Sequence, residues 1–148
     1  MATNPFAGLD IMVPEDYRTH FDTYVQRREG KSARPVHQPF ARNIDMWFAA
    51  ICLAVRKDLK PSGPTGKSYK AAEGVVLSSD PWRPTALMLL AIADTDDASI
   101  VNRPGEMLRI ATGYAVAGLP ELLAILEARE GDTALDYLSE RLESLLKA

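Results

Sequence analysis

Apolar side chains recur at helical spacing along most of this chain, and proline, glycine and capping residues separate the repeats. The pattern predicts five to six helices, from Pro14 to about Gly30, from Asn43 to Lys57, from Asp80 to Ala93, from Pro104 to Ala117, from Pro120 to Glu130, and from Asp132 to the C-terminus. The second and third are apolar on all sides, which is typical of helices at the centre of a domain. The predicted fold class is all-α or nearly so, a compact bundle.

Other stretches lack this period. Residues 1–13 are predicted to form an irregular N-terminal arm in front of a single helical domain at 14–148. Residues 58–73, rich in proline and glycine, are predicted to form a flexible loop within that domain. A short β-branched piece at Val75–Leu77 is the only segment expected to be extended.

Composition fits one ordinary globular domain, because the chain has 148 residues, of which 47% are hydrophobic and 25% charged. The longest apolar runs are about half of the ~20 residues that cross a bilayer, and the N-terminus lacks the layout of a signal peptide. We therefore expect a soluble, cytoplasmic protein with no membrane contact. The single cysteine, Cys52, excludes an internal disulfide and is expected to lie in the core.

Charge is divided between the two halves of the chain. Residues 1–74 hold eleven Lys and Arg against eight Asp and Glu, and residues 75–148 hold six against twelve. A basic N-terminal face suits DNA phosphates or an acidic partner, although ordinary solvated surface charge gives the same pattern. The candidate contact residues are Arg27, Arg28, Lys31, Arg34, Arg42, Arg56, Lys57, Lys60, Lys67 and Lys70.

The segment Pro61–Ser68 looks like part of a phosphate-binding loop. Such a loop needs glycine amides to wrap the phosphates, a lysine and a hydroxyl, all between a strand and a helix. Lys67 and Ser68 supply the second half, but Pro61 replaces the first glycine and Pro64 removes an amide from the cradle. We expect a basic surface loop, and a nucleotide-dependent enzyme using Lys67 and Ser68 is the weaker alternative.

Other catalytic or metal-binding motifs are not apparent in the sequence. Asp94–Asp97 holds three carboxylates, but it lacks the alternating pattern and distal glutamate of a calcium loop, so we expect capping residues there. The chain has two histidines and no Gly-x-Ser-x-Gly elbow. We predict a protein that is not an enzyme, with no catalytic residues, cofactor or metal.

The last predicted helix has one apolar stripe, formed by Leu135, Leu138, Leu142 and Leu145. The stripe packs either on the rest of the domain or on a partner subunit. A homodimer through these four leucines is therefore one alternative for the partner.

Part of the chain resembles a known family. The matching phrases are Ala91–Asp97, Ile100–Val101, Glu106–Ala111 and Tyr114–Leu119, together with the apolar helix after Phe40. Over Phe40 to Leu126 the sequence is similar to the small accessory proteins encoded beside bacterial DNA phosphorothioation (Dnd) systems. It departs from them at Thr112-Gly113 and in the proline-rich insert Pro61–Thr65. The resemblance implies a component of an anti-phage DNA modification locus, with no site residues to carry over.

Taken with the charge pattern, the resemblance predicts a non-catalytic accessory or adaptor protein of a bacterial DNA modification or defence system. Its partners would be other subunits of that system, and its basic N-terminal segments would contact DNA or an acidic partner. The alternative is a protein-interaction or dimerisation module that never meets nucleic acid. The sequence does not identify the partner, the oligomeric state or the pathway.

Overall fold

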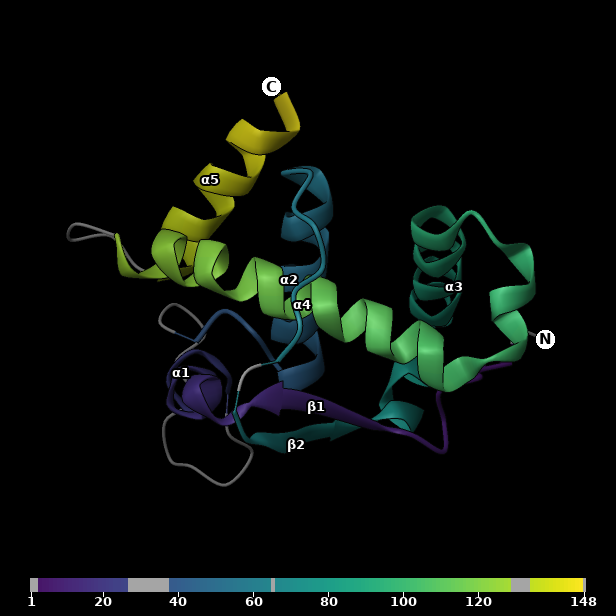
Figure 1. Cartoon of the computed structure of the whole chain (residues 1–148). Coiled ribbons are helices and arrows are strands. Elements are labelled where there is room, and N and C mark those ends of the chain that lie inside the picture. The colour runs from purple at the N-terminus through teal and green to yellow at the C-terminus, as the bar shows by residue number, and fades with distance from the viewer. Residues whose placement is uncertain (1–2, 27–37, 65, 129–133, 148) are drawn as a thin grey trace.

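A computed structural model describes residues 3–26, 38–64, 66–128 and 134–147. The longest helix, α4, crosses the molecule, and the other elements pack around it (Figure 1). In chain order the elements are β1 (Asp10–Pro14), the 3₁₀ helix η1 (Glu15–Tyr17), α1 (Arg18–Tyr24), α2 (Asn43–Arg56), β2 (Ser68–Glu73), η2 (Gly74–Ser79), α3 (Trp82–Thr95), η3 (Ala98–Asn102), α4 (Pro104–Glu127) and α5 (Ala134–Lys147). The prediction of a mostly helical fold is confirmed.

The helices α2 and α4 form the largest helix contact of the fold. They approach closely at Gly118, where a Cβ atom would lie 1.9 Å from the backbone oxygen of Ala50. The core of the fold is filled by large apolar side chains, including Trp47, Met107 and Leu122, which are fully buried. A glycine at the crossing lets the two backbones meet without a side chain between them.

The region from Pro104 to Glu127 is one helix, whereas two were expected with a break at Gly118–Pro120. Pro120 has no N–H to donate to the preceding turn, which normally costs about 3 kcal/mol inside a helix. Here the proline ring is exposed, and both Leu119 and Leu122 beside it are buried. Burial of apolar side chains on both sides offsets the lost hydrogen bond.

A small two-stranded sheet replaces two segments that were expected to be irregular. β1 and β2 pair antiparallel, with Asp10 opposite Glu73 and Pro14 opposite Ser68. The expected irregular arm at 1–13 is therefore wrong from Asp10 onward, and the expected loop at 58–73 is wrong over β2. The pairing joins residues about sixty positions apart in the sequence, so no local sequence pattern predicts it.

Val75–Leu77 is not extended, because it lies inside η2. The turn begins at Gly74, where a Cβ atom would lie 1.9 Å from the backbone oxygen of Phe6. Leu77 is fully buried while Val75 is exposed, which fits a tight helical turn on the core rather than a strand. The prediction of an extended segment here is wrong.

Several helix ends also differ from the predictions. The first helix was expected to begin at Pro14, but Pro14 is the last residue of β1, and α1 begins at Arg18 after η1. α1 ends at Tyr24, well before the expected Gly30, because the next residue forms a bridge to Phe40. At the start of α2 the N-cap is Arg42, and Asp45 accepts the backbone N–H of Arg42 at 3.0 Å. The expected cap, Asn43, is the first helical residue and donates its side-chain N–H to the carbonyl of Ala71. The expected boundaries at Gly30, Glu130, Gly131 and Asp132 lie outside the described residues.

Helix α4 is the one described helix that is long and apolar enough to cross a membrane. In this structure it packs against α2, α3, α5 and the sheet, and much of its surface is buried. Its apolar side chains are thus accounted for by the core of the fold.

Candidate functional site: a groove between α2 and α3

Helices α2 and α3 lie on the same side of α4 and run in the same direction (Figure 1). Their N-terminal halves meet where the rings of Phe48 and Trp82 pack edge to face, with centroids 5.3 Å apart. Toward the C-terminal ends the two helices line a cavity of about 600 Å³, into which Val55 projects from α2 and Leu90 from α3. We call this cavity, which lies between the ends of α2 and α3, the groove.

The fold leaves several apolar side chains of α2 and α3 in solvent, and one of them, Val55, lines the groove. Trp82 is 58% exposed, Leu89 is 61% exposed and Val55 is 45% exposed. Cys52, one turn before Val55, is also exposed, so the prediction that it lies in the core is wrong. Clustered exposed apolar side chains mark surfaces that bind another molecule.

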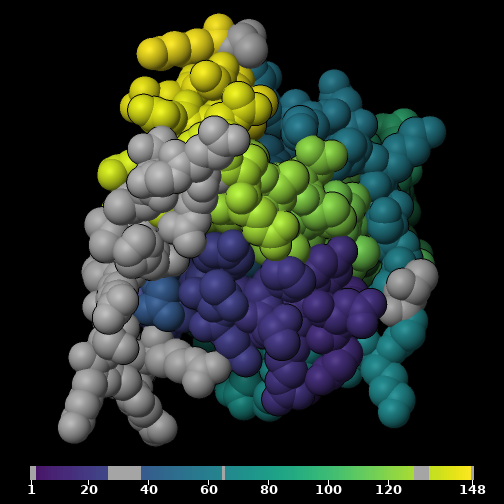
Figure 2. Space-filling view, turned by 90° about the vertical axis from the view of Figure 1, so that its left-hand side faces the viewer, coloured from purple at the N-terminus to yellow at the C-terminus, as the bar shows by residue number. Residues whose placement is uncertain are grey.

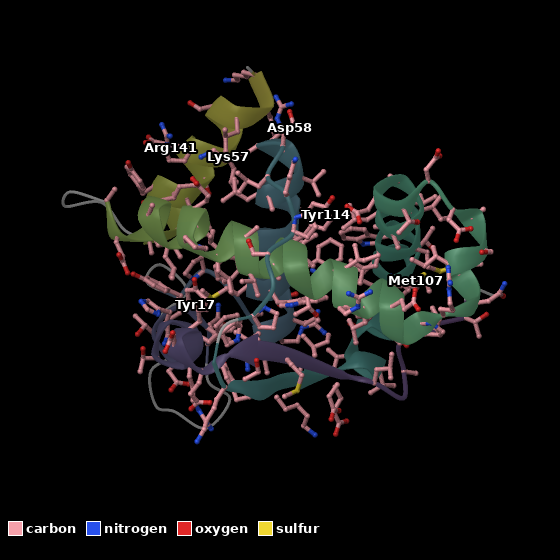
Figure 3. The ribbon with its side chains drawn as sticks, viewed as in Figure 1. Tyr17, Lys57, Asp58, Met107, Tyr114 and Arg141 are labelled. Carbon is pink, nitrogen blue, oxygen red and sulfur yellow. The ribbon has the colours of Figure 1, made fainter. Side chains whose placement is uncertain are left out.

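Tyr114 of α4 lies between α2 and α3 and lines the cavity (Figure 3). Its hydroxyl donates a hydrogen bond of 2.6 Å to the Asp94 carboxylate at the end of α3. Burial first, and then the hydrogen bond and charge of Asp94, raise the pKa of Tyr114 to about 12. The phenol therefore stays neutral at physiological pH. Its hydrogen bond to Asp94 connects α4 to the end of α3.

The C-terminal end of the groove has charged residues of both signs. Asp58 and Asp94 line the cavity, and Asp96 ends α3 in the left-handed conformation with φ of 54°. Lys60 is the cation among the described lining residues. Because α2 and α3 both end here, the negative ends of two helix dipoles add to the field of these carboxylates.

The opposite end is held by a partly buried cluster of alternating charges. Asp45 accepts hydrogen bonds from Arg83 at 2.8 Å and from Arg42 at 3.2 Å, and Arg42 also reaches Asp80 at 3.2 Å. The Arg83 guanidinium lies 5.1 Å from the centre of the Phe48 ring. Burial acts to raise the pKa of Asp45, but the hydrogen bonds from the two arginines outweigh it and lower that pKa. The cluster ties the start of α2 to the start of α3.

Of the ten basic residues predicted to contact DNA, the structure describes six. Arg27, Arg28, Lys31 and Arg34 lie outside the described residues. Arg42 belongs to the cluster above, Arg56 donates to the carbonyl of Leu145 at 2.6 Å, Lys57 pairs with Glu121 at 2.6 Å, and Lys70 lies 3.4 Å from Glu73. Lys60 and Lys67 are exposed and form no ion pair among the described residues. Their role in binding DNA stays a prediction.

The segment Pro61–Ser68 does not have the setting of a phosphate-binding loop. It follows a helix, α2, and leads into a strand, β2, which is the reverse of the order that such a loop needs. The amide of Ser62 is already used, since it donates to the carbonyl of Gly113 in α4 at 2.9 Å. A Cβ atom on Gly113 would lie 2.8 Å from the Cβ of Pro61, so the loop rests directly on α4.

We expect nucleotide to leave the stability of this protein unchanged. A ligand present at a hundred times its dissociation constant adds about 2.7 kcal/mol to the free energy of unfolding. Thermal unfolding with and without ATP and Mg²⁺ measures this directly, with Lys67→Ala as the matched variant. A rise in melting temperature that Lys67→Ala abolishes would contradict the expectation and favour a nucleotide-dependent enzyme.

The carboxylates of Asp94–Asp97 act within the fold. Asp97 accepts the backbone N–H of Ser99 at 2.9 Å and caps η3, which confirms the prediction of a capping role for this residue. It also pairs with Arg103 at 2.9 Å. Among the described residues no group of three or more His, Cys, Asp or Glu side chains is arranged to hold a metal ion.

The C-terminal helix α5 lies against the end of α4 (Figure 2). Of the four leucines in the predicted stripe, Leu138 is buried and Leu145 packs on the core, while Leu135 and Leu142 are exposed. Leu146 is the most exposed leucine of this helix. The stripe therefore divides between the core and solvent, so that a dimer contact could use only its exposed part.

Leu138 and Leu142 provide a matched pair for stability. Leu138→Ala removes buried methyl groups from the contact between α5 and α4, and we expect the free energy of unfolding to fall by about 2 kcal/mol. Leu142→Ala should change it by less than about 0.5 kcal/mol, because Leu142 is partly in solvent. Urea unfolding of the two variants measures the difference, and equal losses would contradict this packing of α5.

No protein-family model, curated protein or solved structure matches this chain. The resemblance to the phosphorothioation accessory proteins thus stays a prediction.

The sequence pattern did not reveal the groove. Val55, Trp82 and Leu89 lie in helices that are apolar on all sides, and that pattern was interpreted as full burial. No sequence pattern predicted the role of Tyr114, because its hydrogen-bond partner Asp94 lies twenty residues away in the chain.

Proposed function

We propose that this protein is a non-catalytic interaction module that holds a partner protein in the groove between α2 and α3. The observation that carries the proposal is the cavity of about 600 Å³ between α2 and α3, lined by the exposed Val55, on helices that also expose Trp82 and Leu89. Large apolar side chains in solvent are costly unless another surface covers them. The cytoplasmic location expected from the sequence is part of this proposal.

The pairing of the cations supports a protein partner over DNA. Phosphate binding needs lysine and arginine side chains that are available to replace counterions. Arg42, Lys57 and Lys70 each have a carboxylate of this chain within reach. A DNA contact would have to break these pairs or use other cations, whereas the groove needs no rearrangement.

An adaptor of a DNA modification system remains compatible with this proposal. Such an adaptor can act entirely through protein contacts, with its partner subunits bound in the groove. In that case the Dnd resemblance suggests who the partner is, and the groove is where this protein binds it.

Affinity purification from the native host tests the proposal. The tagged protein is compared with Leu89→Asp, which places a charge on the exposed face of α3 next to the lining residue Leu90, and with Val75→Asp, which places a charge at the exposed apolar position of η2. We expect a partner in fixed ratio with the wild type and Val75→Asp, retained after nuclease treatment, and lost with Leu89→Asp.

Recovery of nucleic acid in place of a protein would overturn the proposal. The DNA alternative predicts binding that falls with salt, with a log–log slope of roughly −0.9 per neutralised phosphate. Replacing Arg27, Arg28, Lys31 and Arg34 with alanine should then flatten that slope, while Leu89→Asp should leave it unchanged.

A further inference from the structure

We infer that Gly113 of α4 is a positioning residue for the groove, because it holds in place the segment that forms one of the groove's walls. The inference rests on the proposed function and adds the residue that sets the shape of the site. Gly113 is not among the described residues that line the groove. Its effect on a bound partner is exerted through Pro61, which does line it.

One wall of the groove is a chain segment without helix or strand. Four consecutive lining residues, from Asp58 to Pro61, follow the end of α2, and the other described lining residues lie in α2, α3 and α4. The segment runs on across α4 toward β2 (Figure 1). Helical hydrogen bonds fix the backbone of the helical walls, whereas this segment depends on its contacts with neighbouring elements.

The segment touches α4 at Gly113. The backbone N–H of Ser62 donates to the carbonyl of Gly113 at 2.9 Å. A Cβ atom on Gly113 would lie 2.8 Å from the Cβ of Pro61 and 3.3 Å from the backbone oxygen of Ser62. Because the Cβ of Pro61 belongs to a ring closed on the backbone, it cannot turn aside, and the segment itself must move. Glycine at position 113 is therefore what allows this approach.

Tyr114, the next residue of α4, keeps its place when Pro61 moves. Its hydroxyl is hydrogen-bonded to Asp94 of α3 at 2.6 Å, and both residues line the groove. A methyl group on Gly113 thus shifts one wall of the groove relative to the others without replacing any described lining residue. A partner that fits the present shape loses contacts, because the centre of a protein interface is packed as densely as a protein interior.

A double-mutant cycle between Gly113→Ala and Pro61→Gly tests the inference. The probe is the dye anilinonaphthalene sulfonate, whose apolar rings suit Val55 and Leu90 and whose sulfonate suits Lys60. With Pro61 present, Gly113→Ala should weaken dye binding by about five- to tenfold. In the Pro61→Gly background, which lacks the obstructing Cβ, the same change should weaken it by less than about twofold.

Two controls separate the position of the wall from a general loss of stability. Gly105→Ala adds a methyl group to α4 where nothing lies within 4 Å of it, and it should bind the dye as the wild type does. Val55→Asp, in the lining, should abolish dye binding, and Val75→Asp, at a similarly exposed position of η2, should not. A loosened core binds more of this dye, so weaker binding by Gly113→Ala cannot come from lost stability.

Failure of the inference is distinct from failure of the proposed function. Equal dye binding by Gly113→Ala and the wild type, or an equal loss in both backgrounds of the cycle, would overturn the positioning role and leave the partner site in place. Dye binding that Val55→Asp leaves intact would overturn it as well, since this wall would then enclose no apolar pocket. Retention of the partner by Leu89→Asp in the affinity purification would overturn the proposed function whatever the dye shows.

Discussion

Gly118→Ala is expected to lower the free energy of unfolding by about 3 kcal/mol. The added methyl group would lie 1.9 Å from the backbone oxygen of Ala50 and 3.2 Å from the Cβ of Ala54. Neither neighbour is the free end of a flexible side chain, so α2 and α4 must move apart along their largest contact. Forcing extra volume into a packed interior costs about 1 to 3 kcal/mol, and the backbone contact puts this site at the upper end.

Two other glycines of α4 serve as controls. Gly105 has nothing within 4 Å of an added Cβ atom, so Gly105→Ala should raise stability by about 0.5 kcal/mol through helix propensity alone. Gly113 packs against Pro61 of the loop after α2, so Gly113→Ala should lower the free energy of unfolding by about 1 kcal/mol. Urea unfolding of the three variants ranks them by stability. A Gly118→Ala variant as stable as the wild type would contradict the close crossing of α2 and α4.

Asp45→Asn should lower the free energy of unfolding by about 2 to 3 kcal/mol at neutral pH. The side chains of Asp45 and Arg83 are only 18% and 14% exposed. Water can therefore replace little of the charge and hydrogen bonding that the Asp45 carboxylate provides to Arg83. Removing one member of a buried ion pair leaves the other charge without compensation, and hydrogen bonds to charged groups contribute about 1.5 to 3 kcal/mol each.

The difference between wild type and Asp45→Asn should depend on pH. The pKa of Asp45 is lowered in the folded protein from its ordinary value of 3.8, through hydrogen bonds from Arg42 and Arg83 that outweigh the effect of burial. A lowered carboxyl pKa gives stability that is complete above the unfolded value and is lost as the pH falls through the folded value. The two proteins should therefore differ fully above about pH 5 and converge below pH 3.8.

The exposed pair of Lys70 and Glu73 is the control for the cluster at Asp45. Both side chains are about half exposed, and Lys70→Ala should change stability by no more than about 0.5 kcal/mol at any pH. Denaturant titrations at several pH values compare the variants. A difference for Asp45→Asn that persists unchanged at pH 3 would mean that packing, and not the carboxylate charge, sets its effect.

Helices with a clear local period could be predicted from the sequence, because helical hydrogen bonds join residues four positions apart. α2 was predicted over nearly its observed length from its apolar run and the cations at its end. The start of α4 followed from Pro104 at its first turn. The break expected at Gly118 and Pro120 was wrong, since local propensity favoured it and burial against α2 outweighed it.

The mostly helical fold could be predicted from the sequence, because helix periodicity and capping are properties of neighbouring residues. Tertiary contacts set the pairing of β1 with β2, the partners of Arg42 and Lys57, and which apolar side chains stay in solvent. Each of these depends on residues far apart in the chain brought together by packing, and no local pattern encodes them. The groove between α2 and α3 belongs to this second group, because its lining comes from α2, the segment after it, α3 and Tyr114 of α4.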